Sequence, residues 1–370
     1  MAGIIEQLGF SRLVNVFDNN NLIDDEIVVI KQAIDFGIDS IYFCTNENHS
    51  YPALFLKKIN EFDEVSLKNI AEIQQRIWNF KKILFLYVYT DTELRIYNCV
   101  KKPLIKKQQT NCRDELKDFE IITATVSDKE KLNTLSSLFS AIAIDTGIIW
   151  TLEDAFCVRE RINIQTRIDN FLVTSLIRTA QNLVAEGLKL SLVHKLLLRS
   201  LFLLYLEDRG ATDDKFYKKI NNEANSYFSI LENVEDTYKL FRILENHFNG
   251  SLFEVTVNEE IKIKKKHLQL IKKCFTYGDD GTSQQILFSD WRIFNFKIIQ
   301  IELLSEIYEN FMAEMEPEKK QQTGTFYTPP TLVEFILNEK LPTEKIYKQS
   351  LVSKINPSTI QTPADIQVTY

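Results

Sequence analysis

Residues 40–57, SIYFCTNENHSYPALFLK, decide the fold predicted for the N-terminal part of the chain. Residues 40–44 and 53–57 are short runs rich in β-branched and aromatic side chains, and the polar residues 46–50 between them are typical of a turn. Two such runs separated by a polar turn predict a β-hairpin. The fold expected here is therefore a sheet that begins with two antiparallel strands.

The residues that follow this hairpin alternate between helical and extended patterns. Residues 65–78 carry apolar side chains at spacings of three and four, which predicts an amphipathic helix. Residues 83–89 and 93–98 are two more β-rich runs, separated by three polar residues, and predict a second hairpin. The order β-β-α-β-β, after a leading helix, indicates a small α/β domain over residues 1–110.

The next part of the chain is basic and then helical. Residues 101–117 contain six lysines and arginines and are interpreted as a linker with an exposed arm, which is either a solvated surface or a contact to phosphates. From about 128 to 320 the apolar side chains recur with helical spacing, and one of these runs ends at Gly187. Residues 111–320 are therefore expected to form a helical connector domain.

Composition limits the class of protein. The chain has 370 residues and a net charge of −7, so a contact with nucleic acid would be local. Its 5 cysteines form no CxxC pair, which supports neither a zinc site nor a disulfide framework and favours a reduced, cytoplasmic location. The most apolar run, 190–206, is interrupted by charges and is shorter than the roughly 20 residues of a membrane span, so no membrane segment is expected.

Residues 323–330, TGTFYTPP, differ in character from the helical part. The two prolines keep the segment extended, and a helix is predicted directly after them at 331–341. A helix N-terminus attracts carboxylate groups, so the junction could hold a polar ligand or could simply be a loop that leads into a helix.

The same stretch resembles motif X of the gamma-type N6-adenine DNA methyltransferases. The resemblance implies an S-adenosylmethionine pocket lined by Phe326, Tyr327, Thr328 and Pro329, and an adenine flipped out of double-stranded DNA for methylation. Residues 145–150 (DTGIIW), 201–210 (LFLLYLEDRG) and 302–312 resemble segments of the large type IIG-like restriction-modification enzymes. Residues 321–345 would then begin a methyltransferase domain.

Two motifs of that family do not occur in the sequence. The chain has no D/N-P-x-x-G-x-G loop and no Asn/Asp-Pro-Pro-Tyr/Phe tetrapeptide, and Asn356-Pro357-Ser358-Thr359 is the nearest approach to the second. Residues 346–370 are expected to be an atypical tail. The interpretation is a truncated or split methyltransferase, inactive alone, whose remaining part could be a second chain.

The α/β domain carries a second candidate chemistry. Its β-β-α-β order resembles the core of PD-(D/E)xK nucleases, which bind Mg²⁺ to activate water. Asp39 could be the first acid, Lys57 the lysine and Glu72 a relocated acid, because position 55 holds Phe55 where an acid is needed. An active endonuclease, a degenerate nuclease-like domain and a non-catalytic DNA-binding scaffold all stay open. The fold class expected is α+β: a nuclease-like α/β domain, a mainly helical connector and the first helix of a methyltransferase domain.

Overall fold

The computed structural model of the chain describes residues 4–10, 13–18, 24–45, 50–103, 112–248, 251–279 and 292–315. The chain divides into two compact units, Met1–Met315 and Glu316–Tyr370, and every described residue belongs to the first. The predicted helix at 331–341, the expected cofactor residues and the expected tail therefore lie outside the described residues.

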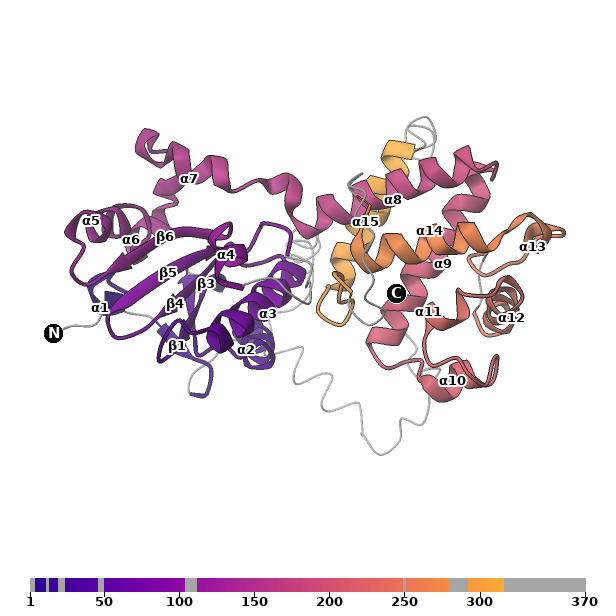
Figure 1. The fold of residues 1–370 in the computed structure, drawn as a ribbon, viewed down its shortest axis with the longest axis horizontal. Helices are drawn as coiled ribbons and strands as arrows, with labels where there is room; N and C mark the ends of the chain where they lie inside the picture. Colours follow the sequence, from indigo (N-terminus) through magenta and orange to yellow (C-terminus); the bar gives the residue numbers. More distant parts are fainter. Residues whose placement is uncertain are drawn as a thin grey trace, which may run out of the picture. The chain divides into compact units, whose positions relative to one another are not determined.

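The N-terminal half of the first unit contains a six-stranded mixed sheet whose strands follow one another in sequence order (Figure 1). The strands are β1 (Leu13–Asn15), β2 (Ser40–Thr45), β3 (Ser50–Lys58), β4 (Phe85–Tyr89), β5 (Glu93–Asn98) and β6 (Glu120–Thr125). Every neighbouring pair is antiparallel except β3 and β4. These two are parallel because α3 (Glu64–Phe80) carries the chain back to the other end of the sheet between them.

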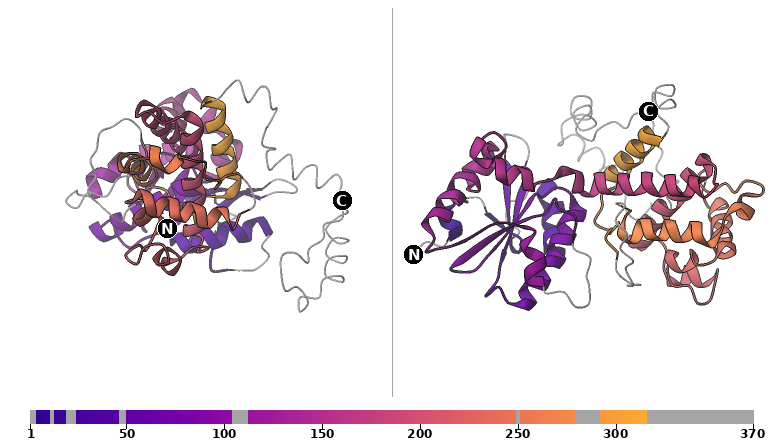
Figure 2. Two further views of the ribbon diagram at one scale, coloured as in Figure 1. Left: turned by 90° about the vertical axis from the view of Figure 1, so that its right-hand side faces the viewer. Right: turned by 45° about the horizontal axis from the view of Figure 1, so that its top comes forward.

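Helices cover both faces of this sheet, as Figure 2 also shows. One face packs against α2 (Asp24–Phe36) and α3, and the other against α1 (Ile4–Gln7), α5 (Lys129–Leu138) and α6 (Ala141–Thr146). On β3, Phe55 enters the first core while Leu54 and Leu56 enter the second. Since both faces are buried, the strands have nearly continuous apolar sequences such as FLYVY in β4.

Both predicted hairpins and the helix between them are confirmed, but the sheet contains two strands more than the sequence predicted, the three-residue β1 and the strand β6. After residues 104–111, which are not described, α4 (Cys112–Lys117) leads into β6, and β6 pairs with β5. Its sequence, EIITAT, is half polar and only six residues long, so it carries a weak strand signal beside the basic stretch. The α/β architecture consequently continues beyond residue 110.

The helical pattern predicted after residue 128 is also confirmed. Beyond α6 the structure contains short 3-10 turns η1 (Ile148–Trp150), η2 (Glu153–Ala155) and η3 (Ile164–Thr166), and the helices α7 (Phe156–Arg161), α8 (Ile168–Ala185), α9 (Leu190–Asp208), α10 (Asp214–Lys218), α11 (Tyr227–Ile230), α12 (Val234–Glu245), α13 (Glu259–Lys262), α14 (Lys265–Tyr277) and α15 (Ile301–Met315). Gly187 adopts a φ of +94° just after α8, as expected of a helix-ending glycine.

One large apolar cluster holds the helices from α8 onward together, and α3 of the sheet region joins it. Trp78 belongs to this cluster, whereas Ile77 and Phe80 of the same helix face the sheet. The indole Nε1 of Trp78 donates to the carbonyl of Thr166, at 2.9 Å. Helix α3 is thus shared by the sheet and the helical part. In the described part of the chain, no helix is both long and apolar enough to cross a membrane.

Candidate functional sites

Asp39 and Lys57, the two nuclease candidates nearest each other in the sequence, meet at one end of the β2–β3 hairpin. Ser40 pairs with Leu56, so the residues just outside this pair face each other. Lys57 Nζ lies 3.1 Å from Asp39 Oδ1, and the backbone N–H of Lys58 donates to Asp39 Oδ2 at 2.7 Å. The strand register therefore brings the acid and the lysine together, with the Asp39 side chain 33% exposed.

Three further polar residues surround this pair where the parallel strands β3 and β4 end. Lys58 Nζ lies 2.9 Å from Asp91 Oδ1, and both of these side chains are exposed. Tyr89, at the end of β4, interacts electrostatically with Lys58, Asp39 and Asp91. Burial raises the pKa of Tyr89 although the charge of Lys58 opposes this. The end of the sheet therefore carries two carboxylates, two ammonium groups and a neutral phenol.

The third nuclease candidate and the expected acid beside Lys57 are placed differently. Phe55 is fully buried and stacks on Phe80, with the ring centroids 6.2 Å apart, so a carboxylate at position 55 would face the core. Glu72 lies on α3 and lines a separate cavity with Arg76. Within the described ranges, no three or more His, Cys, Asp or Glu side chains form a group that could hold a metal ion. The ion pair of Asp39 and Lys57 is therefore the part of the nuclease hypothesis that the structure brings together.

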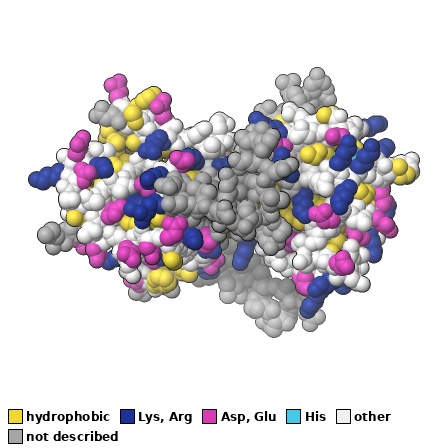
Figure 3. Space-filling model, viewed as in Figure 1, with side chains coloured by type: hydrophobic (Ala, Val, Ile, Leu, Met, Phe, Trp, Pro, Cys, Tyr) yellow, Lys and Arg dark blue, Asp and Glu magenta, His cyan; other side chains and the backbone are white. Residues whose placement is uncertain are grey.

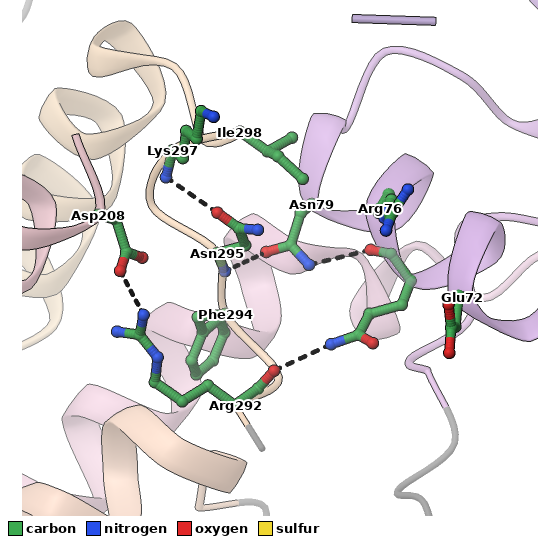
Figure 4. Close-up of a pocket in the computed structure, with 10 residues that line it drawn as sticks. Glu72, Arg76, Asn79, Asp208, Arg292, Phe294, Asn295, Lys297 and Ile298 are labelled. Carbon is green, nitrogen blue, oxygen red and sulfur yellow. Dashed lines mark hydrogen bonds and ion pairs between the residues drawn. The ribbon is translucent and has the colours of Figure 1, made fainter. Parts of the chain in front are cut away.

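The cavity that Glu72 lines, of about 540 Å³, lies between α3 and the segment 292–298 (Figure 4). Amide side chains of α3 hold the backbone of that segment. Gln75 Nε2 donates to the carbonyl of Arg292 at 2.9 Å, and Asn79 Nδ2 donates to the carbonyl of Ile293 at 3.0 Å. The N–H of Asn295 donates to Asn79 Oδ1 at 2.8 Å. The sequence did not predict these residues, although a polar Asn79 between Trp78 and Phe80 was a visible break in an apolar pattern.

Glu207, Asp208 and Arg209, at the C-terminal end of α9, form a network of structural contacts. Glu207 Oε2 accepts from the N–H of Tyr227 at 2.6 Å, and Arg209 Nη2 donates to the carbonyl of Ile299 at 3.1 Å. Asp208 forms an ion pair with Arg292 and accepts from the N–H of Phe296 at 2.8 Å. Burial raises the pKa of Glu207, in spite of the hydrogen bond from Tyr227. Asp208 and Arg209 therefore connect α9 to the segment that leads into α15, and Glu207 connects α9 to α11.

The DTGIIW segment also has a structural role. Asp145 accepts hydrogen bonds from the hydroxyl of Tyr42 at 2.7 Å and from Cys44 Sγ at 3.1 Å, which fixes α6 to β2. Burial, followed by the contact with Asp145, raises the pKa of Cys44 to about 12. Gly147 ends α6 with a φ of +63°, a conformation that favours glycine. The segment therefore joins two elements of the α/β part.

The lysines of α14 favour a solvated surface over a DNA contact. Lys265 and Lys272 lie beside Glu232, and Lys266 lies beside Glu186, so acidic partners already neutralise much of this charge. Lysine and arginine side chains are mixed with acidic ones over the face shown in Figure 3. Surface pairs of this kind contribute little to stability, because solvent screens them.

Helix α15, which leads toward the methyltransferase-like motif, packs into the core of the helical part. Leu303, Ile307 and Phe311 are buried, and the Phe311 ring meets the ring of His194 edge to face, with centroids 5.2 Å apart. At its N-terminal half, Glu306 lies 2.8 Å from Lys81 Nζ at the end of α3. The helix is consequently fixed to both parts of the first unit.

Comparison with known proteins identifies the segment that begins with this helix. Residues 299–353 match the family model described as N-6 DNA Methylase. No curated protein and no solved structure matches the chain. The N-6 DNA methylases normally use S-adenosylmethionine, and DNA is the substrate that the family suggests. Phe326, Tyr327, Thr328 and Pro329 fall within the matched range but outside the described residues. The match supports a relation of residues 299–353 to the adenine DNA methyltransferases.

Proposed function

We propose that the chain is the N-terminal portion of a site-specific adenine N6 DNA methyltransferase in a restriction-modification system of the type IIG-like kind. The observation that carries the proposal is the family match at residues 299–353, whose first helix, α15, is built into the core of the preceding helices. The methylase-like segment is thus continuous with a folded unit. In this proposal residues 1–110, together with β6 that completes their sheet, are a nuclease-like domain, the rest of 111–320 is a connector, and 321–345 are the start of the methyltransferase domain.

S-adenosylmethionine is the methyl donor in this proposal. The described part of the matched range does not form a pocket for it, because Leu303, Ile307 and Phe311 use the apolar face of α15 for packing. The proposed contacts therefore fall on Phe326, Tyr327, Thr328 and Pro329, as the motif resemblance implies. When bound, the cofactor supplies an electrophilic methyl group to the N6 amino group of an adenine.

We further propose that these residues supply only one part of the cofactor pocket. The patterns that would hold the rest of the cofactor and the target adenine do not occur in these 370 residues, and Gly324 is the last glycine of the chain. A glycine-rich loop is needed because only a backbone without side chains approaches the cofactor closely. The chain would accordingly contribute one wall of a shared pocket.

A transfer assay with tritiated S-adenosylmethionine and mixed-sequence duplex DNA tests this function. We expect no incorporation with these 370 residues alone, and incorporation into N6-methyladenine when a polypeptide that carries the glycine-rich loop and the Asn/Asp-Pro-Pro-Tyr/Phe motif is added. Tyr327→Ala should abolish that incorporation, and Tyr51→Ala, which changes an exposed tyrosine of the sheet, serves as the matched control. Methyl transfer by the chain alone would refute the shared pocket, and unchanged transfer by Tyr327→Ala would refute the assigned cofactor wall.

Mg²⁺-dependent DNA cleavage is the second candidate function, and the Asp39–Lys57 pair at 3.1 Å is the observation in its favour. In such a site the carboxylate would bind the metal ion and the ammonium group would stabilise the developing charge. Asp39 is instead held by Lys57 and by the N–H of Lys58, and Phe55 replaces the second acid. We therefore favour a nuclease-like domain that does not cleave, which binds DNA or serves as a scaffold.

A further inference from the structure

The cavity between α3 and residues 292–298 contains cationic side chains with hydrogen-bond donors that the packing of the sheet region against the helices leaves available. It is lined by Arg76 of α3 and by Arg292 and Lys297 of the segment, together with the acids Glu72 and Asp208 (Figure 4). Asp208 is already neutralised, because it forms an ion pair with Arg292 and accepts from the N–H of Phe296. With the Arg292–Asp208 pair set aside, two cations, Arg76 and Lys297, and one acid, Glu72, line the cavity.

Two of the three cations are exposed and keep donors for another partner. Arg76 uses Nη1 to donate to the carbonyl of Asp35 at 3.0 Å, which leaves its other guanidinium nitrogens open among the described residues. Lys297 is exposed, and within the described ranges no ion pair or hydrogen bond engages its Nζ. The third, Arg292, has a buried Nη1 with no hydrogen-bond partner in the described part of the chain.

The rest of the lining suits a phosphate on an extended ligand. Phe294 and Ile298 provide an apolar surface, and the amides of Asn79 and Asn295 are held in place by hydrogen bonds with the backbone. A guanidinium group and an ammonium group in the same cavity are the donors that proteins use for phosphate oxygens. The volume of about 540 Å³ admits a nucleotide unit.

We propose that this cavity binds a phosphate group, and that the phosphate is a phosphodiester of duplex DNA held by Arg76 and Lys297. The choice of DNA rests on the proposed function, because the family match suggests DNA as the substrate. That the cavity binds a phosphate group rests on its side chains alone and does not depend on the proposed function. The cavity lies between the sheet region and the helical part, so a ligand in it touches both. A strand bound here contacts both α3 of the sheet region and the segment that leads into α15, so DNA binding stabilises the junction between them.

The experiment compares the full chain with a double variant, Arg76→Gln/Lys297→Gln, by fluorescence anisotropy with a labelled mixed-sequence duplex over a range of salt concentrations. The matched control is Lys215→Gln/Lys219→Gln, which removes the same charge from exposed positions on and beside α10. We expect the test variant to bind DNA about 10-fold more weakly near 0.1 M salt. The slope of log K against log salt should fall by about 0.9 for each lost phosphate contact, and the control should match the parent chain.

A second arm separates the two sources of phosphate. Adenosine monophosphate and inorganic phosphate are added to each protein, and the thermal midpoint is measured. Suppose that adenosine monophosphate or inorganic phosphate raises the thermal midpoint of the parent but not of the test variant, while both proteins bind DNA equally. This result supports a phosphate site for a small ligand and overturns the DNA assignment. If the test variant and its control bind DNA equally and have equal thermal midpoints, the cavity is not a phosphate site. If the parent chain binds no duplex at all, DNA is not its substrate and the proposed function fails. If only the test variant loses DNA binding, the phosphate site is supported and the proposed methyltransferase function stands. Circular dichroism of both variants establishes that they are folded.

Discussion

Replacing Asn79 by alanine should weaken the junction between α3 and the segment that enters α15. Asn79 is 1% exposed, and its side chain satisfies the carbonyl of Ile293 and the N–H of Asn295. Alanine leaves both backbone groups without this partner, and each buried unsatisfied group costs about 1–3 kcal/mol. Because the adjoining cavity admits water, we take the lower part of this range and expect a loss of about 2–3 kcal/mol in the free energy of unfolding.

Urea denaturation followed by tryptophan fluorescence measures this loss, since Trp78 lies beside Asn79 and is buried in the helical core. The thermal midpoint should fall by about 4–12 °C, given about 2–4 °C for each kcal/mol in a unit of this size. Asn79→Asp keeps the acceptor for Asn295 but loses the donor to Ile293, so it separates the two contacts. Asn222→Ala at an exposed position is the control and should stay within about 0.5 kcal/mol of the parent. A loss below about 0.5 kcal/mol for Asn79→Ala would refute the inferred role of this amide.

Three other variants test separate parts of the account. Phe311→Ala should cost about 3–5 kcal/mol in urea denaturation, because it leaves a cavity between α15 and His194; a change under about 1 kcal/mol would show that α15 is not part of the core. Burial by itself raises the pKa of Asp169, but the effects of Arg167 and Lys81 are larger together and lower that pKa. The stability that this carboxylate contributes is therefore present above about pH 4 and is lost as the pH falls through its lowered pKa. Denaturation of Asp169→Asn from about pH 6 to pH 2 should therefore show a smaller acid-induced loss than the parent, and parallel pH profiles would contradict this assignment. Plasmid DNA with Mg²⁺ should stay intact with the purified chain, whereas cleavage that Lys57→Ala removes would establish the nuclease function instead.

Much of the α/β part follows from local sequence patterns. The strands of the two hairpins are apolar runs separated by short polar turns, and α3 has a clear helical periodicity. Each of these elements is completed within a short stretch of chain, so its local sequence is enough to predict it. The same holds for the ends of α8 and α9, where Gly187 and Gly210 adopt positive φ angles. The meeting of Asp39 and Lys57 could also be expected, because the hairpin register places them opposite each other.

The contacts that join the two parts could not be predicted in this way. Asn79 and Asn295 are separated by 216 positions in the sequence, and no local pattern indicates that an amide in α3 will hold a distant backbone. Strand β6 was missed because its half-polar sequence is stabilised by pairing with β5 and not by its own propensity. The cavity with Arg76 and Lys297 exists only after this long-range packing forms.

The most direct test of the central claim is the N6-methyladenine content of DNA from cells that produce the protein in its natural genomic setting. The DNA is digested to nucleosides, quantified by mass spectrometry and sequenced for modified positions. We expect N6-methyladenine at one short recognition sequence, and we expect it to disappear in a strain that carries Tyr327→Ala. Methylation at the same positions and to the same extent in both strains would contradict the central claim.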